Sequence, residues 1–183
     1  MDSEPHPEFH SAETGKPFRD CISCGLGLDH DPALPYLVAK SYHRTECIFE
    51  YAICDDCRSN MSEEFSIESR QALGRFFEER VKMRERSHLL TLGNGPEPWI
   101  EKCAACRTPR NQLETYSLGG ILLGIQMVYD PYPLCLCGEC EEEIQSLLSL
   151  KTRGMWDEFL EHHFDGPPAD MEDLPVRGRP ALF

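Results

Sequence analysis

The sequence predicts an α+β protein made of two copies of one unit, in which each unit joins a cysteine-bearing turn, a β-hairpin and a helix. Three observations support this prediction: a doubled pattern of paired cysteines, a repeated apolar helix face, and strand-like runs between the cysteine pairs. The 183 residues are enough for one domain or for two small ones. We expect the two copies to pack together around a pseudo-two-fold axis, as one continuous body.

Eight of the ten cysteines form four Cys-x-x-Cys pairs, and the last two pairs repeat the first two at an offset of about 82 positions. Each copy supplies four thiols, which is the number that closes a tetrahedral zinc site. Iron is an alternative, because tetrahedral sulfur sites accept either metal. An interleaved, cross-braced pairing is a less favoured alternative to pairing within each copy. The sequence therefore predicts two structural zinc ions per chain with these ligands: Cys21, Cys24, Cys54 and Cys57 in the first site, and Cys103, Cys106, Cys137 and Cys140 in the second.

The duplication extends into a helix that follows each second cysteine pair. Ser66 and Ser149 occupy equivalent positions just before that helix, where a serine oxygen can accept a hydrogen bond from a first-turn N–H. The i, i+3, i+4, i+8 spacing of one helix face occurs in both copies, at Leu73, Phe76, Phe77 and Val81 and again at Trp156, Phe159, Leu160 and Phe164. Shared ligands, caps and apolar faces together predict an internal repeat.

The elements of the first copy follow one another in a recognisable order. Residues 21–25 form a zinc-knuckle turn, in which the glycine tolerates a positive φ. Residues 37–42 and 48–53 are rich in β-branched and aromatic residues and predict two strands. Cys54 and Cys57 then open a helix, whose N-terminal N–H groups favour thiolates. A knuckle, a hairpin and a ligand pair on the first turn of a helix resemble the treble-clef class of zinc fingers, here in tandem.

The second copy differs in its middle. Residues 116–129 contain Gly119, Gly120 and Gly124, so we expect strands there with bends or a bulge at the glycines. The expected segments are a disordered acidic tail (1–17), a first zinc-binding repeat (18–92), a linker (93–96), a second zinc-binding repeat (97–166) and a proline-containing tail (167–183).

Two cysteines lie outside the four pairs. The favoured interpretation of Cys47 and Cys135 is that they are buried, small apolar side chains. The alternative is a reactive thiol: Cys135 lies two residues before a predicted ligand, and His43 precedes Cys47 by four residues as a possible base. The even spacing would place His43 and Cys47 on the same face of one strand.

Charge limits the classes of partner. The formal net charge is −14, and zinc-bound thiolates would make it more negative. The most basic stretch, 75–86, also contains three glutamates, so we expect no nucleic-acid binding. No secretory signal or membrane-spanning stretch is visible, which predicts a cytoplasmic protein without membrane contact.

These observations favour a binding protein over an enzyme, because closed metal sites leave no catalytic position. We expect a protein-interaction adapter or accessory subunit, either a monomer or a homodimer, whose partner the sequence does not identify. The alternative is a metal or thiol-redox sensor that uses zinc release or Cys135 or Cys47 chemistry. The acidic cluster at 139–143 suits a helix start, and as a functional patch it could receive a basic partner. The terminal segment 177–183 is a candidate docking peptide.

Overall fold

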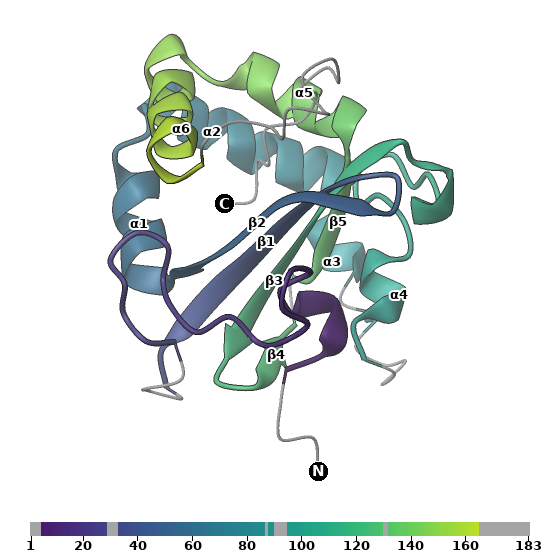
Figure 1. Ribbon diagram of the computed structural model, residues 1–183. Coiled ribbons are helices and arrows are strands. Elements are labelled where there is room, and N and C mark those ends of the chain that lie inside the picture. Colours follow the sequence, from purple (N-terminus) through teal and green to yellow (C-terminus); the bar gives the residue numbers. More distant parts are fainter. Residues whose placement is uncertain (1–4, 29–32, 87, 90–94, 130–131, 165–183) are drawn as a thin grey trace.

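The computed structural model describes residues 5–28, 33–86, 88–89, 95–129 and 132–164 (Figure 1). The strands are β1 (Pro35–His43), β2 (Glu46–Cys54), β3 (Thr115–Leu123), β4 (Gln126–Val128) and β5 (Leu134–Cys137). The helices are α1 (Asp55–Glu63), α2 (Ile67–Phe76), α3 (Met83–Arg86), α4 (Glu97–Ile100), α5 (Gly138–Leu147) and α6 (Leu150–His163). Short 3₁₀ turns lie at Pro7–Phe9 and Arg110–Gln112, and a π-helical turn, Phe77–Val81, follows α2. The protein is therefore a mixed α/β structure, and none of these helices is long and apolar enough to cross a membrane.

The strands form one antiparallel sheet with the order β2-β1-β3-β4, and β5 pairs with the same edge of β3 as β4 does. The hairpin β1–β2 comes from the N-terminal half of the chain, and β3, β4 and β5 come from the C-terminal half. The two halves meet where β1 pairs with β3 along nine residue pairs, with Ala39 opposite Gly119. The centre of the sheet is thus the junction between the two cysteine-bearing segments.

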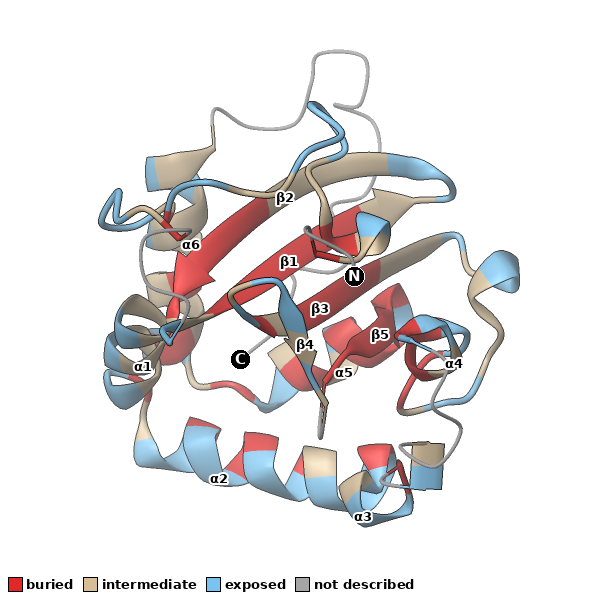
Figure 2. Cartoon of the chain, turned by 90° about the horizontal axis from the view of Figure 1, so that it is seen from below, coloured by how far each residue is buried: buried red, intermediate tan, exposed pale blue. Residues whose placement is uncertain are grey.

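The two faces of the sheet are covered by different parts of the chain. Successive strand residues point to opposite faces. Tyr51, which pairs with Ala39, contacts Phe159 of α6 with ring centroids 5.5 Å apart, so this face lies against the helices (Figure 1). Lys40 follows Ala39 in β1 and therefore points to the other face, where its Nζ donates to the carbonyl of His10 in the N-terminal segment. Figure 2 shows that buried residues are concentrated in the strands of the sheet.

That N-terminal segment differs from the disordered tail expected over 1–17. Residues 5–17 lie on the sheet, and the Phe9 side chain is only 1% exposed within the apolar core. The buried Lys40 ammonium donates a hydrogen bond of 2.6 Å to the main-chain carbonyl of His10. The segment is acidic, but its buried aromatic ring, the Lys40 ammonium and hydrogen bonds to the Glu50 carboxylate hold it against the sheet.

The expected helix starts are observed. The side-chain oxygen of Ser66 accepts a hydrogen bond from the N–H of Ser69, and that of Ser149 accepts one from the N–H of Thr152. The apolar face of the first copy does not stay in regular α-helix, because α2 ends at Phe76 and a π-helical turn follows. Each cysteine-bearing pair is thus followed by two helices separated by a serine-capped break.

Of the three glycines at which the sequence predicts a bend, Gly124 turns the chain, whereas Gly119 and Gly120 do not. Both glycines lie inside β3, which is regular across them. The chain instead turns at Gly124, which has φ +59°, and the strand that returns is divided into β4 and β5. The register irregularity lies in the first hairpin, between Ser41 and Tyr42.

Candidate metal centres

The first cysteine cluster is formed by three separate elements. Cys21 and Cys24 lie in the N-terminal turn, Cys54 ends β2, and Cys57 lies in the first turn of α1. Their four sulfur atoms all lie within 4.8 Å of one another, and those of Cys24 and Cys54 are 3.8 Å apart. These four side chains therefore converge on one point.

The second cluster repeats this geometry with the other four cysteines. Cys103 and Cys106 lie in a turn, Cys137 ends β5, and Cys140 lies in the first turn of α5. The four sulfurs again lie within 4.8 Å of one another, with 3.6 Å between those of Cys106 and Cys137. The pairing within each copy is the one observed, and the interleaved alternative is not.

The two turns have the same backbone conformation. The N–H of Gly25 donates to the carbonyl of Cys21 at 2.8 Å, and the N–H of Arg107 donates to the carbonyl of Cys103 at 3.0 Å. Gly25 has φ +71° and Arg107 has φ +69°. A left-handed conformation costs a non-glycine residue roughly 1–2 kcal/mol. The turn is therefore strained at Arg107 but not at Gly25.

Main-chain N–H groups point at one sulfur in each cluster. The N–H of Cys54 donates to the sulfur of Cys21 at 3.3 Å, and the N–H of Cys137 donates to the sulfur of Cys103 at 3.4 Å. Cys54 and Cys137 are also the N-cap residues of α1 and α5. Both the N–H donors and the positive end of the helix dipole stabilise thiolates.

The thiols of each cluster differ in their pKa values. Burial alone would raise the pKa of Cys21, but hydrogen bonds led by the main chain of Cys54 outweigh burial and lower that pKa to about 7. Hydrogen bonds from the thiols of Cys137 and Cys140 hold the pKa of Cys103 far below its usual value. The pKa of Cys54 is raised to about 12, mainly by burial. One thiol in each cluster is therefore prepared to ionise first.

The donor set and the spacing fit a tetrahedral metal ion. Sulfurs about 2.3 Å from a zinc ion at tetrahedral angles lie roughly 3.8 Å from one another. The Cys24–Cys54 and Cys106–Cys137 sulfur distances, 3.8 and 3.6 Å, agree with this spacing. Four-sulfur sites accept zinc or iron. Both clusters could therefore hold either of these two metal ions.

The two unpaired cysteines differ in burial, since Cys135 is buried and Cys47 is half-buried. Cys135 is fully buried, and burial raises its pKa well above the usual thiol value. Burial and then the Glu50 carboxylate raise the pKa of Cys47 to about 12. The prediction that His43 and Cys47 lie on the same face of one strand is wrong. The chain turns between them, and Cys47 pairs with Tyr42, so it shares a face of the sheet with Tyr42 and not with His43.

Among the described residues, only the two cysteine clusters bring three or more metal-binding groups together, so the histidines and acidic residues of α5 and α6 form no third site there. His162 and His163 lie in the last turn of α6, where they suit the helix dipole. In the acidic cluster, Glu143 pairs with Arg80 at 2.6 Å, while Glu141 is buried. The glutamates at 139–143 therefore do not form one continuous carboxylate patch.

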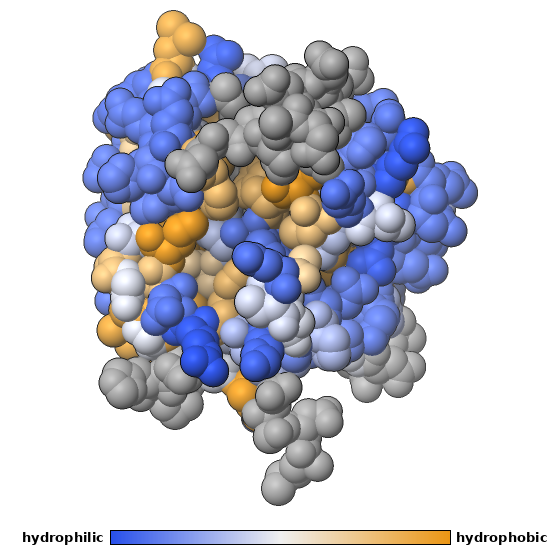
Figure 3. Space-filling view, in the orientation of Figure 1, coloured by the Kyte–Doolittle hydropathy of each residue, from blue (hydrophilic) through white to orange (hydrophobic). Residues whose placement is uncertain are grey.

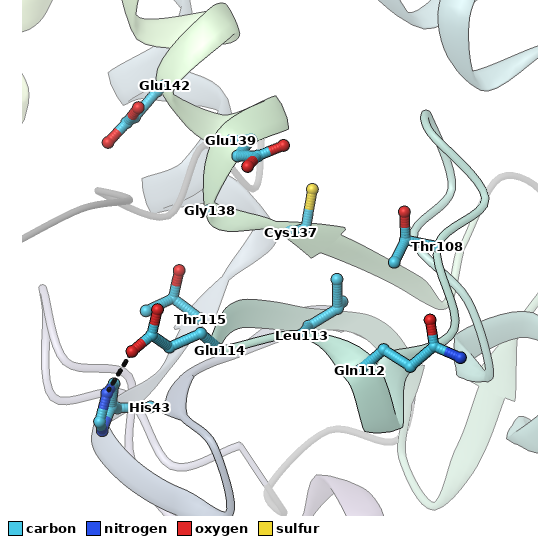
Figure 4. Close-up of a pocket in the computed structure, with 10 residues that line it drawn as sticks. All are labelled: His43, Thr108, Gln112, Leu113, Glu114, Thr115, Cys137, Gly138, Glu139 and Glu142. Atoms are coloured by element: carbon cyan, nitrogen blue, oxygen red, sulfur yellow. Dashed lines mark ion pairs between the residues drawn. The ribbon is translucent and has the colours of Figure 1, made fainter.

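A cavity beside the second cluster was not expected from the sequence. It has a volume of about 440 Å³ and lies between the start of α5 and the segment that leads into β3 (Figure 4). The described residues that line it are His43, Thr108, Gln112, Leu113, Glu114, Thr115, Cys137, Gly138, Glu139 and Glu142. These residues come from three distant parts of the chain, so no local motif marks the cavity.

Comparisons with protein-family models, with curated proteins and with solved structures each found no match. The class of the protein is therefore defined by its own features: a mixed α/β chain with one antiparallel sheet and two four-cysteine clusters that could hold metal ions.

Proposed function

We propose that the chain is a zinc protein with two structural four-cysteine sites, and that its task is to bind another protein. The observation that carries this proposal is that each cluster supplies four sulfurs within 4.8 Å of one another. Four thiolates fill the tetrahedral coordination of zinc and leave no position for water or substrate. A closed site stabilises a fold, and the function then belongs to the surface.

We propose that each copy is a treble-clef-like unit. The support is the order of elements around each cluster: a cysteine turn, antiparallel strands, and a ligand pair at the start of a helix. Tyr36 pairs with Cys54 and Tyr116 pairs with Cys137, so the strand residue opposite the capping ligand is a tyrosine in both copies. The helix of each copy starts at that same ligand.

The proposed pseudo-two-fold axis has support from two separate places. Matching Tyr36 with Tyr116 also matches Ala39 with Gly119, and these two residues pair with each other in the sheet. The capping segments exchange hydrogen bonds in the same way, because Ser66 N–H donates to Thr152 Oγ1 at 3.1 Å and Ser149 N–H donates to Ser69 Oγ at 2.9 Å. A two-fold axis predicts both exchanges.

The surface supports a protein-binding role. Ile67 and Leu150 are the first residues after the two capping serines, and they remain 63% and 80% exposed. Exposed large aliphatic side chains are typical of interaction surfaces when they occur together. Figure 3 shows hydrophobic areas among the mostly hydrophilic residues of one face of the molecule. The net charge of −14 argues against a nucleic-acid partner.

A redox-sensor function has less support. Such a sensor needs an accessible thiolate, whereas burial and raised pKa values keep Cys47 and Cys135 protonated. Cys24 and Cys106 are the exposed members of their clusters, and oxidation would reach them first. The candidate docking peptide at 177–183 lies outside the described residues.

The test is native mass spectrometry of the reduced protein, together with elemental analysis and partner capture. We expect two zinc ions per chain that are released only on unfolding. The double variant Ile67→Ser/Leu150→Ser should keep both metals and capture less of any partner from the cell of origin. Iron, a single metal, or zinc released reversibly by mild oxidant would contradict the closed structural sites. If the double variant captured as much partner as the parent protein, Ile67 and Leu150 would not be part of the binding surface.

A further inference from the structure

The N-terminal segment, residues 5–17, lies on the sheet as a self-contained unit. Its main-chain hydrogen bonds are internal: the N–H of Phe9 donates to the carbonyl of His6 at 2.9 Å, and the N–H of Gly15 donates to that of Ser11 at 2.8 Å. Among the described residues, no main-chain hydrogen bond joins this segment to a strand. The segment is therefore not a strand of the sheet, and its departure would leave no main-chain group of the sheet without its partner.

Charged side chains of the sheet bind the main chain of this segment. The Lys40 ammonium donates a hydrogen bond of 2.6 Å to the carbonyl of His10, and the Glu50 carboxylate accepts one of 2.8 Å from the N–H of Ala12. The same carboxylate accepts a hydrogen bond of 2.7 Å from the hydroxyl of Ser11. In peptide recognition, main-chain hydrogen bonds supply affinity, whereas contacts with side chains supply specificity. Lys40 and Glu50 therefore hold the segment as a binding site holds a peptide.

Two further contacts select the side chains of the segment. The ring of Phe9 lies over Gly120, where a Cβ atom would be 2.5 Å from a ring carbon, so the missing side chain at position 120 makes room for the ring. The Glu8 carboxylate accepts a hydrogen bond of 3.0 Å from the Arg110 guanidinium. This surface fits an acidic residue followed by an aromatic one. We call it the docking face, and its residues are Lys40, Glu50, Arg110 and Gly120.

The docking face is compatible with water. Lys40 Nζ lies 3.6 Å from Glu50 Oε2, so both charges keep a partner when the segment leaves. Water can then replace the carbonyl and N–H groups of the segment. Phe9 is the only aromatic or large aliphatic side chain of residues 5–17, and the segment contributes no ligand to either cysteine cluster. Uncovering the docking face therefore exposes one aromatic ring and leaves both metal clusters complete.

We propose that the docking face binds an acidic segment of the partner protein that carries an aromatic side chain, and that residues 5–17 occupy the face until that segment displaces them. The inference rests on the proposed protein-binding function and specifies the surface and the chemistry of the partner. The occupant is argued from the segment seated there, in which Glu8 and Phe9 meet Arg110 and Gly120. A tethered segment has an effective concentration on the order of 1 mM at its own site, so a free peptide of the same sequence competes poorly with it.

The test is a titration of the zinc-loaded protein with a fluorescein-labelled peptide that has the sequence of residues 5–17, monitored by fluorescence anisotropy. Phe9→Ala weakens the tethered occupant and leaves the docking face unchanged. We expect the peptide to bind Phe9→Ala at least tenfold more tightly than it binds the parent protein. A peptide with alanine in place of its phenylalanine, or with glutamine in place of its first glutamate, should bind this variant more weakly, at least tenfold so for the alanine peptide.

The blocking variant is Phe9→Ala/Gly120→Ala, in which a Cβ atom takes the space of the ring. It should bind the peptide at least tenfold more weakly than Phe9→Ala does. The matched control is Phe9→Ala/Gly154→Ala, because a Cβ atom on Gly154 meets nothing within 4 Å. This control should bind the peptide as tightly as Phe9→Ala, and all three variants should keep two zinc ions.

A second measurement uses the parent protein and decides the proposal if Phe9→Ala does not fold. Hydrogen exchange should show that the amides of Phe9 and Ala12 open together, more often than the amides of β3 and without unfolding of the sheet. Exchange of these two amides only on global unfolding would overturn the proposal, because the segment would then be a permanent part of the core.

Equal affinity of the peptide for Phe9→Ala and the parent protein, or equal binding of the alanine peptide, would also overturn it. A parent protein that forms dimers, which Phe9→Ala abolishes, would replace the partner segment with the segment of a second copy. A negative titration would reject the docking face alone, because partner capture by Ile67→Ser/Leu150→Ser tests the protein-binding function separately.

Discussion

At the scale of single residues, the glycine at position 120 allows the N-terminal segment to lie on the sheet. A Cβ atom on Gly120 would be 2.5 Å from a ring carbon of Phe9, which is 1% exposed. Because the ring is packed in the core, it has little room to move. We expect Gly120→Ala to displace Phe9 and to lower the free energy of unfolding by about 1–3 kcal/mol, measured by urea denaturation.

The control for this variant is Gly154→Ala. A Cβ atom on Gly154 meets nothing within 4 Å, and the residue lies inside α6, where alanine is the better helix former. We expect Gly154→Ala to keep or raise the stability by up to about 1 kcal/mol. If the two variants were equally stable, Phe9 would not occupy the space above Gly120.

A second prediction at the residue scale concerns the reactivity of Cys47 with pH. Only the thiolate is nucleophilic, and a pKa of about 12 leaves roughly one Cys47 in 10⁴ ionised at pH 8. Its thiolate fraction, and with it alkylation by iodoacetamide, should increase only as the pH rises toward 12. We expect peptide mass spectrometry of the native, zinc-loaded protein at pH 8 to find Cys47 and Cys135 unmodified.

The same reagent under denaturing conditions provides the control, because an unfolded thiol ionises near pH 8.5. Both cysteines should then be alkylated completely. Rapid alkylation of either residue in the native protein would reinstate the thiol-sensor function.

At the scale of elements, the starts of α2 and α6 are joined by a buried hydroxyl network. Ser69 and Thr152 are fully buried, and each accepts a hydrogen bond from the capping serine of the other helix. Thr152→Val keeps the shape of the side chain but leaves the N–H of Ser66 without this acceptor. We expect a loss of about 1–3 kcal/mol in the free energy of unfolding, measured by chemical denaturation.

Ser146→Ala is the matched change outside the network. The Ser146 hydroxyl donates only to the carbonyl of Glu143 in its own helix and is exposed. Its removal should change stability by less than about 0.5 kcal/mol. An equally small effect of Thr152→Val would mean that the helix starts are not held together by this network.

The sequence predicts the elements better than their connections. The caps at Ser66 and Ser149 and the helix starts after Cys54 and Cys137 are encoded by neighbouring residues, so they could be read locally. The placement of Phe9 over Gly120 could not, because it depends on contacts about 110 positions apart along the chain. The division of the return strand into β4 and β5 and the cavity beside Cys137 are likewise products of tertiary packing.

At the scale of the whole molecule, the two cysteine clusters are built on one sheet, because Cys54 ends β2 and Cys137 ends β5. β1 belongs to the N-terminal half of the chain and β3 to the C-terminal half, and they pair along nine residue pairs at the centre of the sheet. The main apolar core contains residues of both halves, and a structural zinc can contribute on the order of 10 kcal/mol to folding. Loss of one metal should therefore destabilise strands that belong to the other copy.

This coupling can be tested with Cys106→Ser, which removes one ligand at an exposed position and disturbs little packing. We expect the variant to hold one zinc ion and to unfold in a single transition at lower denaturant than the parent, because neither copy keeps a complete sheet on its own. Hydrogen exchange should accelerate in β1 and β2 as well as in β3 and β5. Cys47→Ser is the control, since it changes a thiol outside both clusters and should keep two zinc ions. Two separate unfolding transitions, or faster hydrogen exchange confined to 97–164, would contradict this coupling. Either result would mean that the two halves fold independently, and that losing one metal does not destabilise the strands of the other half.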